Sequence, residues 1–474
     1  MGVTVGRRAW MLAAAVVSLS MVLPPLQPTA NAAVSTSLRR YPYLTDVVGP
    51  YATVNWATAT SGTASVKYGI SGRESCTAHS VAATRLGIVV NGKAESQWKA
   101  QLTLSPNTTY CYRVFLGSTD LLGSDASPKF VTQLPAGSTS AFSFAVFGDW
   151  GQGPSSNTHQ ANILKRIAQS GARFAITVGD NGYPSGSQTN YGDLVQDGTN
   201  VSGVFGPNFW RVAGASLPIF PAIGNHGFVR SDAVHPHFAN WPQDRAVATS
   251  GGTYRTETYC CVSGSTSVKA PSAWYAFDAG NARFYVLEAA WTDTSVSNDT
   301  AYQRDHSYHW LPGSPEYEWL AKDLAANPTK AKFAFFHYPF YSDDSTEPSD
   351  PYLLGAQNLE GLLGSNGVRL AFTGHAHIYQ RNRPSPMGVV TYVTGGGGAK
   401  MEPVAGKGCS AIDAYAIGWA YASNRGSACG AATRPTSLDQ VFHFLKVTVN
   451  GKSVTVTPID EMGRVFDQQT YTLP

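Results

Sequence analysis

Between residues 41 and 133 the chain repeatedly alternates hydrophobic with polar positions over short segments. The clearest segments are rich in β-branched and aromatic residues and are separated by Gly and Ser turns: Ala52–Ala57, Ser65–Tyr68, Gln97–Leu104 and Thr109–Leu116. This alternation predicts strands with one buried face, and several of them in a segment of this length are typical of a β-sandwich. The segment contains no cluster of titratable residues, so we interpret it as a packing or spacer module.

The pattern changes after a linker at Gln133–Ser138. A short apolar segment, Phe142–Phe147, predicts a strand, and residues 157–169 have hydrophobic positions at helical spacing. A second buried strand is predicted at Phe174–Val178. Strand, helix and strand in this order indicate a βαβ unit.

The same alternation continues towards the C-terminus. Further strands are predicted at Ile219–Ile223, Lys332–Phe336, Val368–Thr373 and Val389–Thr394, and helices at Pro315–Ala326 and near Leu353–Leu363. The tail, Val441–Pro474, predicts β-hairpins that complete the same domain. We therefore expect an α/β domain over residues 137–474, after a β-domain over residues 33–136.

The N-terminus has the pattern of an export signal. Arg7 and Arg8 precede an apolar run, Ala9–Leu23, and small residues end at Ala30-Asn31-Ala32. The run is shorter than the roughly 20 residues that a membrane anchor needs. We expect residues 1–32 to be a signal peptide cleaved after Ala32, which predicts a secreted or extracytoplasmic protein. Secretory and twin-arginine export both remain open.

Charge and cysteine content narrow the class of protein. Charged residues make up only 14% of the chain, and the formal net charge of +3 falls to +1 without the two arginines of the signal. No nucleic acid is therefore expected as a structural partner. An even number of cysteines in an exported protein favours disulfides. We expect Cys76–Cys111 and Cys409–Cys429, whereas adjacent Cys260 and Cys261 are either free or a vicinal pair.

Candidate metal ligands follow the ends of five predicted strands. They are Asp149, Asp180, Asn225, His337 and His375. Side chains beyond the carboxyl ends of strands in an α/β sheet converge on one site. A single Gly-Asp is usually only a turn, and a His in an aromatic strand is usually a core residue. The five residues in this order are a more specific signal than any one of them alone, and together they predict a metal centre.

The ordered set also resembles a known superfamily. Gly148-Asp149-Trp150-Gly151, Gly179-Asp180-Asn181-Gly182-Tyr183, Gly224-Asn225-His226, His337 and Gly374-His375-Ala376-His377 resemble the metallophosphoesterases, and Tyr183 narrows the resemblance to the purple acid phosphatases. Leu104–Val114 resembles part of a fibronectin type III domain, and the whole β-domain resembles that of the plant-type members. The resemblance implies a fibronectin type III-like sandwich followed by a metallophosphoesterase domain, a four-layer α/β/β/α sandwich.

The resemblance also implies two metal sites. Asp149, Tyr183 and His377 would hold Fe(III), Asn225, His337 and His375 would hold a divalent Zn, Mn or Fe, and Asp180 would bridge the two ions. Carboxylate and phenolate are hard anionic donors that suit Fe(III), whereas imidazole and amide suit the divalent ions. Two such ions can clamp a phosphoryl group, and a hydroxide formed on them would attack it.

His226 is implied to face the substrate, where it would donate to a phosphoryl oxygen or protonate the leaving group; the alternative is a structural histidine behind the ligands.

Plant-type members carry histidines where this chain has Tyr341–Ser345, and we expect the acidic residues there to repel an anionic substrate. His235 and His237 could substitute from another loop, but we interpret them as ordinary surface histidines. Gly395–Gly398 is expected to form a tight loop close to the site.

The predicted function is hydrolysis of phosphomonoesters, that is, of a small-molecule phosphate ester, outside the cytoplasm. Phosphodiesterase activity on nucleotides or lipid head groups is an alternative within the same enzyme class. A wall-binding protein without catalytic activity is the alternative from another class. The natural substrate and the oligomeric state stay open, and no membrane span is expected.

Overall fold

The computed structural model describes residues 1–2, 34–153, 157–195, 203–227, 235–249, 257–259, 268–270, 274–289, 309–406 and 408–473. The predicted signal peptide and the pair Cys260 and Cys261 lie outside these ranges.

The N-terminal part is a sandwich of two antiparallel sheets, as the alternating pattern predicted. One sheet contains β1 (Leu38–Thr45), β2 (Tyr51–Thr58), β6 (Lys93–Thr103) and β5 (Thr84–Val90). The other contains β4 (His79–Ala82), β3 (Ala64–Ile70), β7 (Thr109–Leu116), β8 (Thr119–Asp120) and β9 (Lys129–Val131). Trp56, Trp98 and Tyr112 fill the core between the sheets. The likeness to fibronectin type III stays a prediction.

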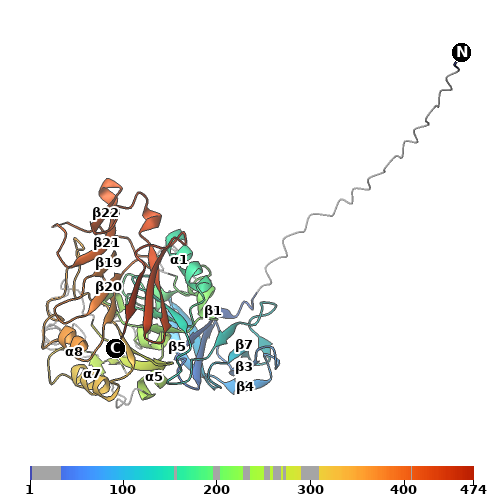
Figure 1. Ribbon diagram of the computed structural model, residues 1–474. Helices are drawn as coiled ribbons and strands as arrows, with labels where there is room; N and C mark the ends of the chain where they lie inside the picture. The colour runs from blue at the N-terminus through green and yellow to red at the C-terminus, as the bar shows by residue number, and fades with distance from the viewer. Residues whose placement is uncertain are drawn as a thin grey trace.

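The first sheet of the sandwich continues into the C-terminal part. Its order is β25-β24-β23-β10-β11-β12-β1-β2-β6-β5, and Thr45 of β1 pairs in parallel with Ile219 of β12. The added strands are β10 (Phe142–Phe147), β11 (Ala175–Thr177), β12 (Ile219–Pro221), β23 (His443–Asn450), β24 (Ser453–Asp460) and β25 (Gln469–Thr472). The two predicted domains thus share one ten-stranded sheet, and the blue strands in Figure 1 lie directly beside the rest of the molecule.

A second large sheet faces this one. It contains, in spatial order, β15 (Tyr275–Ala279), β16 (Ala282–Val286), β17 (Ala331–Phe335), β18 (Leu370–Thr373), β20 (Val390–Thr394), β19 (Tyr379–Asn382), β21 (Asp413–Ala420) and β22 (Arg425–Gly430). Strands β16, β17, β18 and β20 run parallel to one another. Aromatic side chains from both sheets, among them Phe144, Phe174, Phe284 and Phe335, form the core between them.

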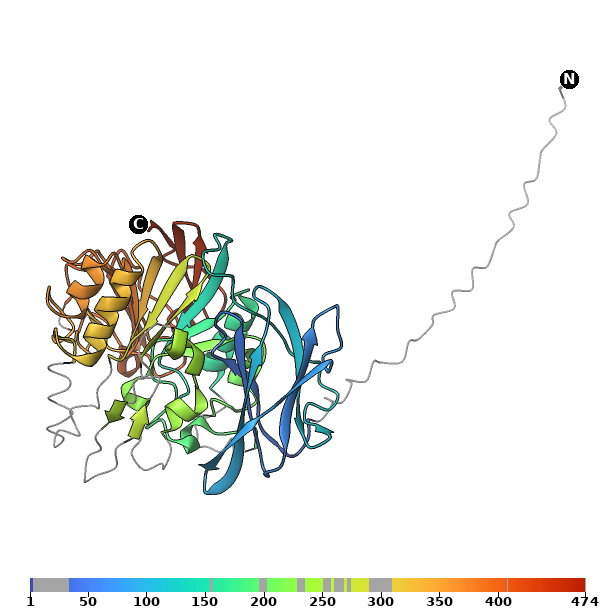
Figure 2. The ribbon, with the colours of Figure 1, turned by 90° about the horizontal axis from the view of Figure 1, so that it is seen from below.

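Helices cover the outer faces of both sheets. On the first sheet, α1 (Thr158–Gln169) and α3 (Trp210–Gly214) pack on one hydrophobic cluster. On the second sheet, α7 (Pro315–Ala326) and α8 (Leu359–Ser365) pack on another. Figure 2 shows α7 and α8, in yellow and orange, at the opposite edge of the molecule from the blue sandwich. The order helix, sheet, sheet, helix is the four-layer arrangement that was predicted.

Shorter elements connect these layers. They are α2 (Gln188–Tyr191), α4 (Pro236–Asn240), α5 (Asp244–Thr249), β13 (Glu257–Tyr259), β14 (Val268–Ala270) and the 3₁₀ turns η1 (Asn225–Gly227), η3 (Tyr421–Ser423) and η4 (Leu438–Gln440). His235 and His237, at the start of α4, are buried, with exposed fractions of 4% and 3%. The interpretation of these two as surface histidines was therefore wrong, because the short helix turns them into the protein.

Strand and helix bounds follow the sequence pattern closely, with one clear exception. Strands β7 and β10 and helix α7 have the predicted bounds, and Asn157 caps the N-terminus of α1 by accepting from the backbone N–H of Gln160. Helix α8 begins at Leu359 and not near Leu353. Gly355 has a φ of +107°, so the backbone cannot stay helical through this position.

The boundary between the sandwich and the C-terminal part is held by Arg40, which is fully buried. Its guanidinium donates to the carbonyl of Gly192 at 3.0 Å and to the side-chain oxygens of Asn240 at 2.7 Å and Gln188 at 2.9 Å. It also donates to Gln97 of the sandwich at 2.7 Å. A buried cation with this many acceptors ties both parts to one geometry.

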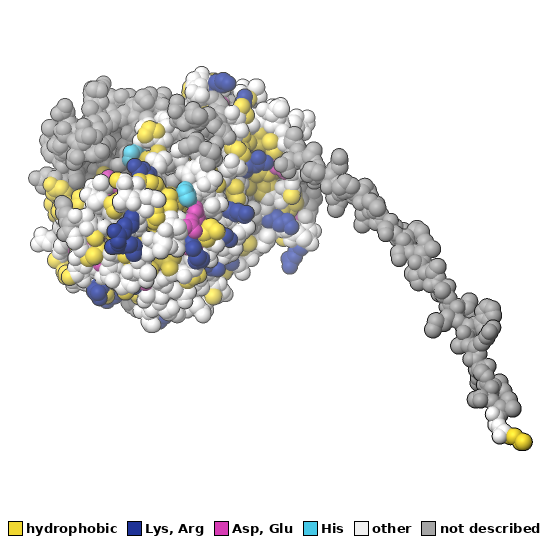
Figure 3. Space-filling view, turned by 90° about the horizontal axis from the view of Figure 1, so that it is seen from above, with side chains coloured by type: hydrophobic (Ala, Val, Ile, Leu, Met, Phe, Trp, Pro, Cys, Tyr) yellow, Lys and Arg dark blue, Asp and Glu magenta, His cyan; other side chains and the backbone are white. Residues whose placement is uncertain are grey.

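Two disulfides are formed, Cys76–Cys111 in the sandwich and Cys409–Cys429 near the end of the chain, as predicted. In the described part of the chain, no helix is long and apolar enough to cross a membrane. On the face shown in Figure 3, the Lys and Arg side chains of the described residues are scattered among uncharged ones.

Candidate metal centre

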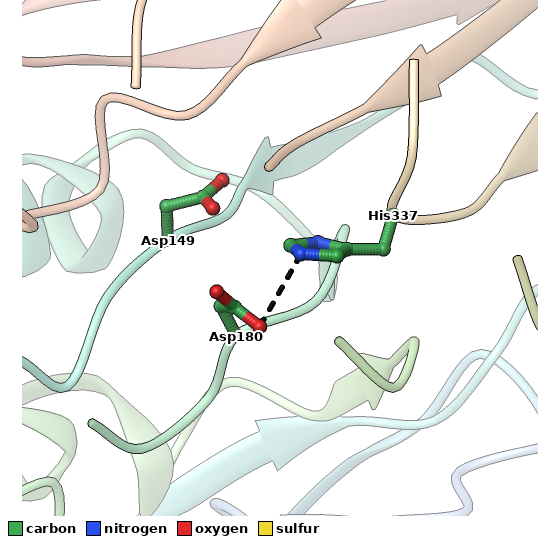
Figure 4. Close-up of side chains that lie close together, drawn as sticks. All are labelled: Asp149, Asp180 and His337. Carbon is green, nitrogen blue, oxygen red and sulfur yellow. Dashed lines mark ion pairs between the residues drawn. The ribbon is translucent and has the colours of Figure 1, made fainter. Parts of the chain in front are cut away.

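The predicted ligands meet at one edge of the two facing sheets. Asp149 follows β10 and Asp180 follows β11 in the first sheet, whereas His337 follows β17 in the second. Each offers one ligand atom, and these three atoms lie within 4.8 Å of one another. In Figure 4 the two carboxylates and the imidazole ring face a common centre. All three residues are at most 1% exposed.

The two carboxylate oxygens of Asp180 face different partners. Oδ2 accepts a hydrogen bond from the hydroxyl of Tyr183 at 2.8 Å. Oδ1 lies 3.3 Å from Nε2 of His337 and also accepts from the backbone N–H of His226 at 2.9 Å. One carboxylate therefore contributes an oxygen to each of two groups of donor atoms.

The first donor group consists of Asp149, Asp180 Oδ2, Tyr183 and His377. The Tyr183 hydroxyl lies 2.9 Å from Nε2 of His377 and 3.5 Å from Oδ1 of Asp149. Nε2 of His377 is also 3.5 Å from Oδ1 of Asp149. Three anionic or potentially anionic oxygens and one imidazole nitrogen thus converge.

The second donor group consists of Asp180 Oδ1, Asn225, His337 and His375. Oδ1 of Asn225 lies 2.8 Å from Nε2 of His337 and 3.1 Å from Nδ1 of His375. This group contains two imidazoles, one amide oxygen and one carboxylate oxygen. Both donor sets fit cations, because buried carboxylates and imidazole lone pairs that point at one another are stable together only with positive charge between them.

Backbone carbonyls set the tautomers of two of these histidines. Nδ1 of His337 lies 2.8 Å from the carbonyl of Val178, and Nδ1 of His377 lies 2.8 Å from the carbonyl of Lys400. Because a carbonyl oxygen can only accept, each Nδ1 carries a proton, and Nε2 is the nitrogen that is left to bind an ion. Nε2 of both rings faces its donor group, as a metal ligand requires.

The backbone at the strand ends is strained. Asp149, Asp180 and His375 have φ angles of 55°, 50° and 68°, in the left-handed region that non-glycine residues rarely adopt. A Cβ at Gly224 would overlap Oδ1 of Asp180, and one at Gly374 would overlap Oδ2 of Asp149. Such strained backbone is typical of functional sites. The overlaps explain why glycines precede the proposed ligands Asn225 and His375.

The electrostatics of the centre depend on burial. Burial raises the pKa of Tyr183 well above its usual range, and the neighbouring Asp180 and Asp149 raise it further. The phenol therefore keeps its proton unless a cation binds. Burial lowers the pKa of His337. Burial also acts to lower the pKa of His377. The hydrogen bond and the negative charge of Asp149 outweigh the effect of burial and raise this pKa to about 10.

Residues 142–379, half of the chain, match the family model of the calcineurin-like phosphoesterases. The chain belongs to this family. Among its curated relatives are purple acid phosphatases 23 and 22 of Arabidopsis thaliana, to which this phosphoesterase is 26% and 24% identical over 322 and 308 residues. These matches cover 64% and 62% of the chain and 62% and 57% of the two relatives, so the chain spans about three fifths of their length.

A solved structure agrees on the fold. The purple acid phosphatase isolated from yellow lupin (Lupinus luteus) seeds superposes with a TM-score of 0.62 at 17% identity. The superposition covers 92% of this phosphoesterase and 74% of the lupin chain. It therefore includes the sandwich as well as the phosphoesterase domain.

His226 lies beside Tyr183 of the first donor group and is partly exposed. Its ring is 4.4 Å from that of Tyr183, between centroids, and its side chain is 37% exposed, against 16% for His377. Nδ1 donates to the carbonyl of Pro184, so Nε2 is the nitrogen that can exchange a proton. Nε2 is 3.9 Å from Oδ2 of Asp180.

The acidic residues of the loop after β17 lie in different surroundings, and their effect on an anionic substrate stays a prediction. Asp343 accepts from the backbone N–H of Ser410, and Asp344 is 8% exposed and accepts from Thr346. Burial, followed by the charge of Glu402, raises the pKa of Asp344 to about 7. The acidic residue of this loop that reaches the centre is Glu347, 2.8 Å from His375. Sequence reasoning missed it, because nothing local indicates where a loop side chain points.

The glycine loop Gly395–Gly398 closes against the centre, as predicted. The backbone N–H of Gly397 donates to the carbonyl of Gly148 at 2.9 Å, and that of Ala399 donates to the carbonyl of Asp149 at 2.8 Å. A Cβ at Gly397 would overlap the carbonyl of Gly148, so the close approach requires glycine. The loop therefore supports the strained backbone at Asp149.

Proposed function

We propose that this chain is a dinuclear metal-dependent phosphoesterase of the purple acid phosphatase type that hydrolyses phosphomonoesters. The observation that carries the proposal is the position of Asp180 between two donor groups, one oxygen towards each. A turn or a core ion pair would not need seven such side chains from two sheets. The seven proposed ligands are Asp149, Asp180, Tyr183, Asn225, His337, His375 and His377.

The donor chemistry supports a different ion in each group. Two carboxylates and a phenol favour Fe(III), whereas two imidazoles and an amide favour divalent Zn, Mn or Fe. Held by these residues, two such ions would supply the charge to bind a phosphoryl group and to activate water for attack. This division of ligands would make the protein coloured, because a phenolate bound to Fe(III) absorbs visible light.

His226 is the residue that we assign to proton transfer. Its exposed Nε2 can donate to a phosphoryl oxygen or protonate the leaving group, and the carbonyl of Pro184 holds the ring in place through Nδ1. Loss of a general acid or base lowers a rate by about 10²–10⁴. Since Nδ1 is already bonded, the ring can exchange its Nε2 proton without turning.

The proposed substrate is a small phosphomonoester outside the cytoplasm. Two disulfides support an oxidising compartment. A phosphodiesterase acting on nucleotides or lipid head groups would use the same metal core. A protein without catalytic activity would not need strained backbone at three ligand positions.

The proposal is tested on the purified full chain. We expect two metal ions per chain, one of them iron, a visible absorption band, and faster hydrolysis of a monoester than of a diester, each followed by the alcohol that it releases. Fewer than one metal ion per chain would contradict the metal centre. A protein that binds metal but hydrolyses diesters faster would support the metal centre and contradict the assigned substrate class.

A further inference from the structure

The carboxylate of Glu347 contacts the proposed metal ligand His375 from outside the donor group. Oε2 of Glu347 lies 2.8 Å from Nε2 of His375. The other ring nitrogen, Nδ1, lies 3.1 Å from Oδ1 of Asn225 in the second donor group. The two ring nitrogens point in different directions, so Glu347 binds the side of the ring that faces away from Asn225.

This contact distinguishes His375 from the other two histidines of the centre. His337 and His377 donate from Nδ1 to backbone carbonyls, which leaves Nε2 for an ion. His375 is reversed, because it presents Nδ1 to the donor group. Its tautomer therefore depends on a partner at Nε2, and that partner is a side chain. A proton on Nδ1 in place of Nε2 would block an ion from this nitrogen.

The loop holds Glu347 ready for this contact. Oδ1 of the buried Asp344 accepts from the backbone N–H of Thr346 at 2.8 Å and of Glu347 at 3.3 Å. An isolated β-bridge between Asp343 and Pro348 closes the loop on both sides of these residues. The Glu347 side chain is 37% exposed, so changing it removes little packing.

We propose that Glu347 is a positioning residue for the divalent ion. By accepting the Nε2–H bond of His375, its carboxylate keeps the lone pair of Nδ1 directed at the second donor group. The inference rests on the proposed function, since it assumes that this group binds an ion. Carboxylate partners of metal-bound histidines typically change metal affinity by about 10–100-fold.

The test measures Zn²⁺ affinity of the full chain by competition with a chelator, after the divalent ion has been removed. Glu347→Ala should weaken Zn²⁺ binding by about 10–100-fold. Glu347→Gln should lie closer to the wild type, because its amide oxygen still accepts the bond from Nε2. Ser345→Ala changes an exposed side chain of the same loop and should bind like the wild type. The tyrosinate band of the iron site should be the same in all of these variants.

Three outcomes would overturn the proposal. Glu347→Ala could bind Zn²⁺ within about twofold of the wild type, well inside the expected change. It could lose Zn²⁺ as completely as His375→Ala does, in which case Glu347 is itself a ligand. If the wild type binds no Zn²⁺ and contains no other divalent ion, the proposed function fails together with the inference; in the first two outcomes the inference alone fails.

Discussion

The hydroxyl of Tyr183 donates a 2.8 Å hydrogen bond to Oδ2 of Asp180, three residues earlier in the chain. Both side chains come from the turn that follows β11, so local sequence is sufficient to bring them together. His377, which is distant in the sequence, lies 2.9 Å from the same hydroxyl. The phenol therefore occupies the middle of the first donor group.

Tyr183→Phe should abolish the visible absorption band while iron stays bound. Burial and the neighbouring carboxylates keep the free phenol protonated, so the coloured phenolate forms only on Fe(III). Asp149, Asp180 and His377 remain to hold the ion. The checks are an absorption spectrum and the iron content per chain. Wild-type protein that contains ferric iron but is colourless would refute the tyrosinate.

Asp180→Asn should lose one or both metal ions and nearly all turnover. The amide keeps the shape of the side chain, but it removes the negative charge and one acceptor oxygen from between the two donor groups. Metal content and phosphatase rate are measured together. The matched control is Asp439→Asn, a partly exposed carboxylate paired with Arg464, which should keep both metals. An Asp180→Asn variant with two metals and a near-normal rate would contradict the bridge.

His226→Ala should retain both metals while kcat falls by about 10²–10⁴. The fall should be smaller for an aryl phosphate with an acidic leaving group than for an alkyl phosphate, because the aryl oxide needs no proton to leave. The measurements are the steady-state rates on the two esters and the metal content of the variant, which together test whether His226 donates a proton to the leaving group. Loss of metal would make His226 a ligand, and an equal fall for both esters would argue against proton donation.

Glu95→Gln should stabilise the fold increasingly as the pH rises. Burial, together with the hydrogen bond and charge of Asp193, raises the pKa of Glu95 to about 8 from 4.5. The folded state therefore binds the extra proton between these pH values, and the contribution of Glu95 to stability falls as the pH rises from 4.5 to 8. A neutral amide does not titrate.

The measurement is the difference in Tm between Glu95→Gln and the wild type at pH 5 and at pH 8.5. A change of 1 kcal/mol in stability shifts Tm by about 2–4 °C in a domain of 150–250 residues. The control is Glu74→Gln, an acidic residue of the sandwich that is exposed to solvent. A Tm difference that does not change with pH would show that Glu95 is charged in the folded state.

The local sequence predicts the strands that carry the ligands because each is a short apolar run that ends at a polar residue. Strand β10 and helix α7 have the predicted bounds for this reason. Helix α8 was predicted to start too early, because the sequence pattern did not show that Gly355 takes a positive φ. Both disulfides of the described residues were also predicted, because the cysteines pair within single regions of the chain.

The relation between the two parts of the chain was not predictable. Composition and the linker indicated two units, and they led to the expectation of a spacer module. Thr45 nevertheless pairs with Ile219, and Arg40 is buried among residues of both parts. A strand pattern shows which face is buried, but it does not show which strand will be the neighbour.

By itself the sequence determined the strand ends, the order of the candidate ligands and the turn that joins Asp180 to Tyr183, because these depend on neighbouring residues and on hydrophobic periodicity. Only the tertiary structure decided the shared sheet, the burial of His235 and His237, and the contact of Glu347 with His375. These features depend on where distant segments pack and in which direction a loop side chain points, and local sequence carries no information on either.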